Sequence, residues 1–119
     1  MRMWMLEPKI LCCKHLLGEH CELHKHKHVF EKHYSIFGRI YPTVLIEPEN
    51  MKKRHDDLAQ EMLSRGYNHQ SSYEQPSLSH LPDDQRYAKA DLEYNLGDLY
   101  DRCPECKKRI ENFLLENKK

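Results

Sequence analysis

Hydrophobic residues recur about every seven positions between residues 9 and 33. The stripe consists of Leu11, Leu16, Leu23 and Phe30, and Leu17 broadens it. This spacing places apolar side chains on one face of a helix. Pro8 is tolerated at a helix start but not inside a helix. The pattern therefore predicts a helix over about 9–33, preceded by an irregular arm at residues 1–8.

A second amphipathic stretch spans residues 48–65. Its apolar face consists of Met51, His55, Leu58, Ala59, Met62 and Leu63. These positions follow helical 3–4 spacing, and Gly66 suits the position just after a helix end. Between the two helices, residues 40–46 are rich in β-branched side chains, but Pro42 argues against a central strand. We expect an extended segment there that packs on the helices.

The remainder of the chain predicts a long loop and two more helices. Residues 67–83 are polar and contain two prolines. Apolar residues recur with helical spacing over about 84–101 and again over about 107–117, at Ala88, Leu92, Leu96, Leu99, Ile110, Phe113 and Leu114. The predicted fold class is all-α: residues 1–119 form one compact domain, a bundle of three to four helices with long loops. The N-terminal arm packs between the helices, and a CxxC segment lies at 98–119.

Composition narrows the class of protein. The chain has 119 residues, a size that fits one domain, with 19 basic and 19 acidic side chains. A net charge of zero argues mildly against nucleic-acid binding. Residues 1–66, however, hold 11 Lys and Arg against 9 Asp and Glu, together with seven of the nine histidines. With no signal peptide and no apolar run long enough to span a bilayer, we expect a cytoplasmic monomer without membrane contact.

The first predicted helix carries many ionisable side chains. His15, Glu19, Glu22 and His26 share one stripe, which either faces solvent or lines a site; Glu22 and His26 could also hold a metal ion. Further along, three histidines alternate with Lys25 and Lys27. They form either a cationic patch facing phosphates or an ordinary solvated face. The basic run Lys52-Lys53-Arg54 is likewise either a patch that faces phosphates or an ordinary solvated face.

Three stretches in order resemble one enzyme family. They are Met1-Arg2, residues 14–23 (KHLLGEHCEL), and residues 51–68, which begin MKKRH and end LSRGYN. Together they are similar to the pyrimidine dimer DNA glycosylase/AP lyase family of the phage endonuclease V type, over about residues 1–70. Two features depart from the family: Cys21 stands where an Arg is usual, and the aromatic-rich tail is missing.

The resemblance implies a catalytic site made of the Met1 α-amine, as the nucleophile that forms a Schiff base, and Glu22. An α-amine has a pKa of about 7.7–8.0, against about 10.4 for Lys, so far more of it is neutral and nucleophilic near pH 7. The implied substrate is double-stranded DNA with a damaged pyrimidine or an abasic site, and no cofactor is required. We expect DNA contacts from Arg2, His15, Lys25, His26 and Arg54. The alternative is a non-catalytic nucleic-acid-binding or zinc-binding module that keeps the fold.

Five cysteines, an odd number in a chain without a signal peptide, argue against a disulfide framework. Cys103 and Cys106 form one CxxC pair, which is half of a structural zinc site. The remaining ligands would come from Cys12, Cys13, a histidine or a second chain. The pair could instead be redox-active or incidental.

Overall fold

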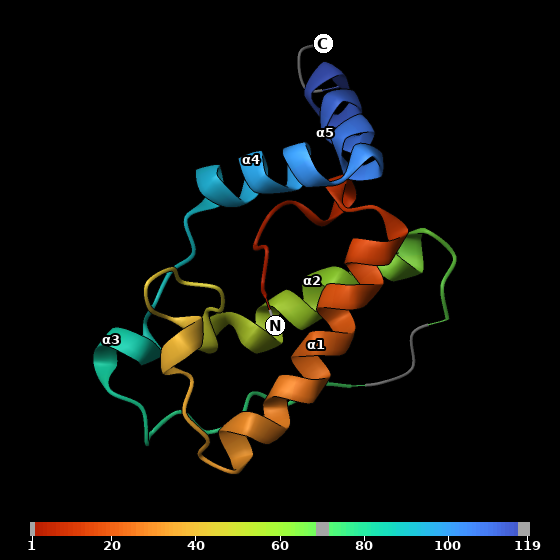
Figure 1. Ribbon diagram of the computed structural model, residues 1–119. Coiled ribbons are helices and arrows are strands. Elements are labelled where there is room, and N and C mark those ends of the chain that lie inside the picture. The colour runs from red at the N-terminus through yellow and green to blue at the C-terminus, as the bar shows by residue number, and fades with distance from the viewer. Residues whose placement is uncertain (1, 69–71, 117–119) are drawn as a thin grey trace.

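The computed structural model describes residues 2–68 and 72–116 and contains helices but no strand within these ranges. Its elements in chain order are η1 (Pro8–Ile10), α1 (Cys13–Glu31), η2 (Phe37–Arg39), η3 (Pro48–Asn50), α2 (Met51–Ser64), α3 (Asp83–Arg86), α4 (Leu92–Arg102) and α5 (Pro104–Glu116). Figure 1 shows this order from red to blue. The predicted all-α fold class is confirmed.

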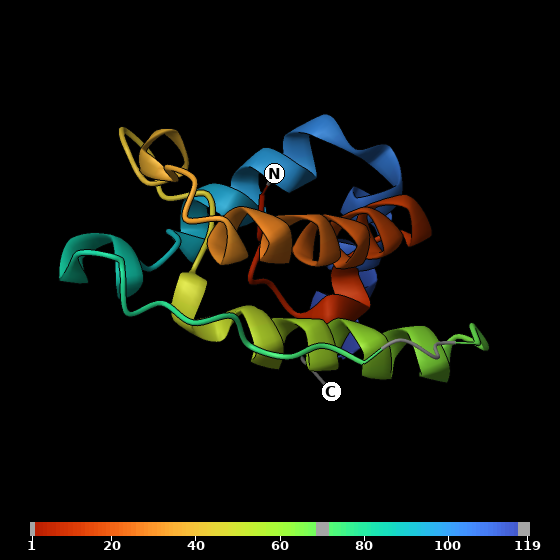
Figure 2. The same ribbon diagram turned by 90° about the horizontal axis from the view of Figure 1, so that it is seen from below.

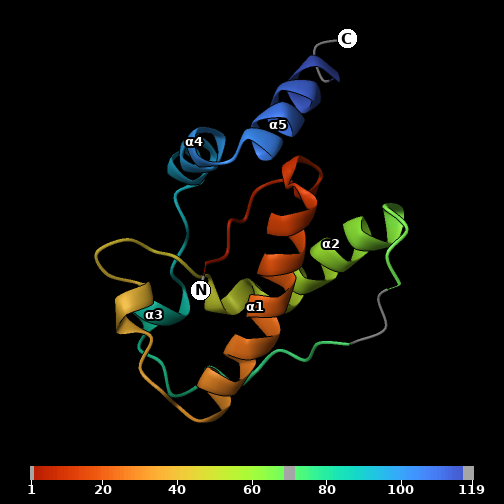
Figure 3. The same cartoon turned by 45° about the vertical axis from the view of Figure 1, so that its right-hand side comes forward.

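Helix α1 packs on α2, and α4 and α5 pack together at one end of the molecule, next to η1. The N-terminal arm runs between these two halves (Figures 1 and 3). The loop that follows α2 turns back along it (Figure 2). Gln75 fixes this return, because it accepts from the Lys52 backbone N–H at 3.0 Å and donates to the Pro48 carbonyl at 2.8 Å. None of the helices among the described residues has the length and apolar character needed to cross a membrane.

Several helix boundaries differ from the sequence prediction. Helix α1 begins at Cys13 rather than Lys9, because Pro8 opens a short 3₁₀ turn and residues 11 and 12 are extended. The single helix predicted over 84–101 is wrong: α3 and α4 are separate. Asp91 caps α4 by accepting the Tyr94 backbone N–H at 3.1 Å. Helix α5 begins at Pro104, a residue that favours the first helical position.

The predicted apolar stripe of α4 is also corrected. Leu92 and Leu96 are exposed, whereas Asn95 is only 2% exposed. The reason lies in the arm, since the Asn95 side-chain amide donates to the Trp4 carbonyl at 3.0 Å. A buried carbonyl needs a donor, so this helix turns an amide rather than a leucine toward the arm.

The arm itself is part of the core. Met3, Trp4 and Leu6 are buried, and Met3 N–H donates to the Leu45 carbonyl at 2.7 Å. Met5 adopts φ 57°, a left-handed conformation that is uncommon for a residue with a side chain. Hydrogen bonds to the carbonyls of the residues before and after Met5 hold this conformation. The arm therefore packs between helices, as predicted.

A buried ion pair joins the arm to both long helices. Arg54 of α2 donates to Glu19 of α1 through Nε at 2.5 Å and Nη2 at 2.9 Å. Its Nη1 donates to the Leu6 carbonyl at 2.6 Å. Both residues are 3% exposed. All three hydrogen-bonding nitrogens of the guanidinium are therefore used to fix the relative positions of three chain segments.

We predict that Arg54→Met destabilises the protein by about 3–5 kcal/mol, because it leaves the Glu19 carboxylate buried without its partner. Lys53→Met is the matched control: Lys53 is exposed, and its ion pair is with Asp57 on the surface of the same helix. That control should stay within about 0.5 kcal/mol of wild type. Urea unfolding followed by circular dichroism measures both. Equal midpoints for the two variants would show that the buried pair does not support the fold.

Candidate functional site

A pocket of about 370 Å³ lies between the arm and the first half of α1. It is lined by Arg2, Trp4, Lys14, His15, Gly18, Glu19 and Glu22. Three residues predicted for the site from sequence therefore come together: Arg2, His15 and Glu22. Met1 lies outside the described residues. Trp4 and Lys14 were not predicted as site residues, and neither stands out from its neighbours in the sequence.

Arg2 is held firmly in this pocket. Its guanidinium donates to Asp98 at 2.5 Å and to Asn95 at 2.7 Å, both on α4. It also lies over the Trp4 ring, 3.9 Å from the centroid. The charge of Arg2 is therefore largely matched by Asp98, and its position is set by α4.

Two of the predicted DNA contacts lie inside the protein. Arg54 forms a buried ion pair with Glu19, so it lies in the interior rather than on a basic surface. His26 is 5% exposed, and burial, together with the positive charge of Arg39, lowers its pKa to about 4. It is neutral at physiological pH and adds no positive charge. Lys25 is exposed, as a phosphate contact requires.

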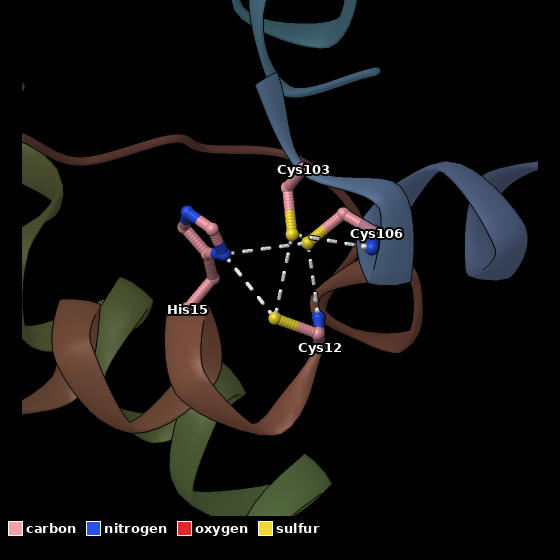
Figure 4. A group of neighbouring side chains, drawn as sticks. All are labelled: Cys12, His15, Cys103 and Cys106. Carbon is pink, nitrogen blue, oxygen red and sulfur yellow. Dashed lines mark hydrogen bonds between the residues drawn. The ribbon is translucent and has the colours of Figure 1, made fainter. Parts of the chain in front are cut away.

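A second cluster lies next to the pocket, where the start of α1 meets the junction of α4 and α5. Figure 4 shows Cys12 and His15 on one side facing Cys103 and Cys106 on the other. Their ligand atoms all lie within 4.8 Å of one another. Each half is built alike: a cysteine in extended conformation precedes a helix, and the second ligand follows three residues later in the first turn.

The separations are close to those of a tetrahedral zinc site. Zn–S bonds of about 2.3 Å and Zn–N bonds of about 2.0–2.1 Å separate two sulfurs by roughly 3.8 Å and a sulfur from a nitrogen by roughly 3.6 Å. Here the Cys12 and Cys103 sulfurs are 3.8 Å apart. His15 Nδ1 lies 3.2 Å from the Cys12 sulfur and 3.5 Å from that of Cys106. The Cys/His cluster can hold a metal ion.

The surroundings of the sulfurs suit thiolate ligands. The Cys12 backbone N–H donates to the Cys106 sulfur at 3.2 Å, and the Cys106 N–H donates to the Cys103 sulfur at 3.4 Å. Burial alone would raise the pKa of Cys103, but hydrogen bonds, first from the Cys106 backbone, lower it. Burial raises the pKa of the Cys106 thiol to about 12. A bound cation would instead favour the thiolate form of Cys106, because a coordinating thiol is deprotonated.

The sequence predicted only half of this cluster. Cys103 and Cys106 were candidate zinc ligands, and Cys12 was one of several residues considered as their partners. His15 was expected to contact DNA, but its Nδ1 faces the sulfurs instead. The spacing Cys12-x₂-His15 equals that of Cys103-x₂-Cys106, and this repeated spacing is the signal that could have identified His15.

Comparison with known protein families shows what the chain is similar to. The family model described as pyrimidine dimer DNA glycosylase matches residues 1–75. That segment contains the arm, α1 and α2, and therefore every described residue that lines the pocket. Comparisons with curated proteins and with solved structures found no match.

We predict that His26 makes stability depend on pH. Its pKa is about 4 in the folded protein against 6.5 ordinarily, so between these values the unfolded chain binds more protons. Stability should therefore fall as the pH drops from about 6.5 to about 4 and lose this dependence below that. His26→Gln should flatten the slope, whereas His28→Gln, an exposed position on the same helix, should not. Urea midpoints at several pH values test this; identical slopes in wild type and His26→Gln contradict it.

Proposed function

The chain belongs to the pyrimidine dimer DNA glycosylase family, and we propose that it is a DNA glycosylase/AP lyase whose nucleophile is the Met1 α-amine. Its substrate would be double-stranded DNA containing a damaged pyrimidine or an abasic site. The observation that carries the proposal is the match over the whole arm–α1–α2 unit, in which Glu22 and Arg2 line one pocket. We also propose that the enzyme acts as a cytoplasmic monomer.

The proposed reaction has two stages. The neutral amine attacks C1′ of the flipped-out nucleotide, the bond from C1′ to the base breaks, and the base leaves with a proton. Ring opening gives an imine between the amine and C1′. The imine withdraws electrons, so a base can remove a C2′ proton while the C3′–O bond breaks and the 3′ phosphate leaves. Hydrolysis of the imine then frees the amine.

The pocket supports specific roles for its residues. Glu22 is the side chain we assign to proton transfer and to stabilising the positive charge that develops on the sugar. Lys14 lines the same pocket, and Lys25 is exposed on the same helix. Both suit contacts with phosphates, which provide most of the affinity for DNA. Arg2, fixed by Asp98, is better placed to shape the pocket than to bind a distant phosphate.

We predict that Glu22→Gln lowers strand nicking of abasic-site DNA by about 10²–10⁴-fold, the range for loss of a general acid or base. DNA binding should persist, because a negative charge near phosphates is removed. Glu31→Gln, an exposed change near the end of α1, is the control and should nick normally. Single-turnover nicking and gel-shift binding measure the two effects. Wild-type nicking by Glu22→Gln would reject this mechanism and favour a binding module.

A borohydride trapping assay tests the nucleophile. Adding one residue before Met1 displaces the amine and should abolish borohydride trapping on abasic-site DNA while leaving the circular dichroism spectrum unchanged. Undiminished trapping by the extended chain would identify a lysine as the nucleophile instead.

We further propose that Cys12, His15, Cys103 and Cys106 bind a structural zinc ion. Three sulfurs and one imidazole nitrogen within 4.8 Å of one another make up the Cys₃His ligand set of structural zinc sites. A redox role needs only two thiols and gives no reason for His15 to direct Nδ1 at two sulfurs. Backbone N–H donors to Cys103 and Cys106 supply the outer hydrogen bonds that zinc thiolates commonly have.

Such an ion would support the pocket without taking part in the reaction. It would fasten the α4–α5 hairpin to the start of α1. His15 lines the pocket and contacts the Trp4 ring edge-to-face, with centroids 5.8 Å apart. Holding His15 therefore holds one wall of the pocket, while α4 presents Asn95 and Asp98 to the arm.

We predict that Cys103→Ser lowers the zinc content by about one ion per chain and lowers the melting temperature, because a structural zinc contributes directly to folding. Cys13→Ser is the matched control, since Cys13 is exposed and lies beside Cys12 outside the cluster. Elemental analysis and thermal unfolding measure both quantities. If the Cys103→Ser protein has the zinc content of wild type, the proposed zinc site at this cluster is wrong.

A further inference from the structure

Three histidines converge where α1 crosses α2, apart from the cysteine cluster. His20 and His24 lie one turn apart on α1, and His55 lies on α2. His55 Nε2 is 3.1 Å from Nε2 of His20 and 3.1 Å from Nε2 of His24. His20 and His55 are 8% and 1% exposed, and His24 is half-buried. Three imidazoles thus turn the same ring nitrogen toward one point.

This convergence has the dimensions of a metal site. Zn–N bonds of about 2.0–2.1 Å in a tetrahedral arrangement separate two nitrogens by roughly 3.3–3.4 Å. The two observed separations of 3.1 Å are close to that value. No two of the rings are parallel: the planes of His20 and His24 are 66° apart, those of His24 and His55 88°, and those of His20 and His55 33°. Rings at such angles can direct their in-plane lone pairs to a common centre.

Asp56 determines which nitrogen of His55 carries the proton. His55 Nδ1 lies 3.1 Å from the Asp56 carboxylate, so Nδ1 carries the hydrogen and donates it. Nε2 of His55 then has one in-plane lone pair. One lone pair cannot accept two well-aligned hydrogen bonds, yet two imidazole nitrogens lie at 3.1 Å from it. A carboxylate behind a ligating histidine is also the usual second layer of a zinc site.

We propose that His20, His24 and His55 bind a second zinc ion, with the fourth position left to water or a further donor. A shared cation can be bound by all three lone pairs at once. The ion would lie beside the buried ion pair, because Glu19 precedes His20 and Arg54 precedes His55. Tyr73 stacks on His55 at 5.0 Å between centroids and covers one side. The bound ion locks α1, which carries Glu22, against α2.

The test uses the full-length chain and measures zinc directly. Wild type purified with zinc should contain about two ions per chain, and His24→Gln about one. His24 is changed because it is the least buried of the three. His28→Gln, an exposed histidine one turn further along α1, is the matched control and should retain two ions. His24→Gln with the same zinc content as wild type would overturn the proposal.

Cobalt substitution separates the two sites, and its wild-type titration does not depend on any variant folding. Titrating zinc-free wild type with Co²⁺ should give two binding phases, of which only one shows thiolate-to-cobalt charge-transfer absorption. Cys103→Ser should lose that absorption and keep the nitrogen-ligated phase; His24→Gln should do the reverse. A wild-type titration with only the thiolate-ligated phase would overturn the histidine site while leaving the cysteine site and the proposed DNA chemistry intact.

Discussion

The guanidinium of Arg54 connects the parts of this molecule that have to be fixed relative to one another. It holds Glu19 of α1 with two hydrogen bonds and the Leu6 carbonyl of the arm with a third. Burying a charge is costly unless every donor is satisfied, and here the three nitrogens each have an acceptor. The pair therefore specifies one crossing of α1 on α2 and one path for the arm, and the pocket at Glu22 depends on both.

The arm is positioned from its other side by α4. Asn95 satisfies the Trp4 carbonyl, and Asp98 matches the charge of Arg2. The hydrogen bonds described for the backbone of residues 3–6 go to other segments of the chain, so polar groups of those segments define the shape of the arm. Met5, in a left-handed conformation, lies between the two carbonyls that Asn95 and Arg54 hold. Such a conformation persists where its surroundings over-determine it.

The C-terminal hairpin lies outside the segment that matches the family model, yet it contacts the pocket twice. Helix α4 meets the arm, and the Cys103 and Cys106 pair meets Cys12 and His15 at the start of α1. The chain therefore combines the matched arm–α1–α2 unit with a hairpin that supports the pocket. The proposed zinc ion at that junction would replace apolar burial, which is sparse in α5, where Leu114 and Leu115 are exposed.

The sequence by itself determined the all-α class, the two long helices, the end of α2 just before Gly66 and the grouping of Arg2 with Glu22. These follow from periodicity, from glycine at positive φ and from a resemblance over contiguous segments, all of which are local. Only the tertiary structure decided that Arg54 and His26 are buried and that His15 faces Cys106, 91 residues further along the chain. Helical spacing shows which residues share a face but not what that face meets. The sequence does not show whether a charged or imidazole side chain will contact water, a carboxylate or other metal ligands. Its partner is brought next to it only by folding.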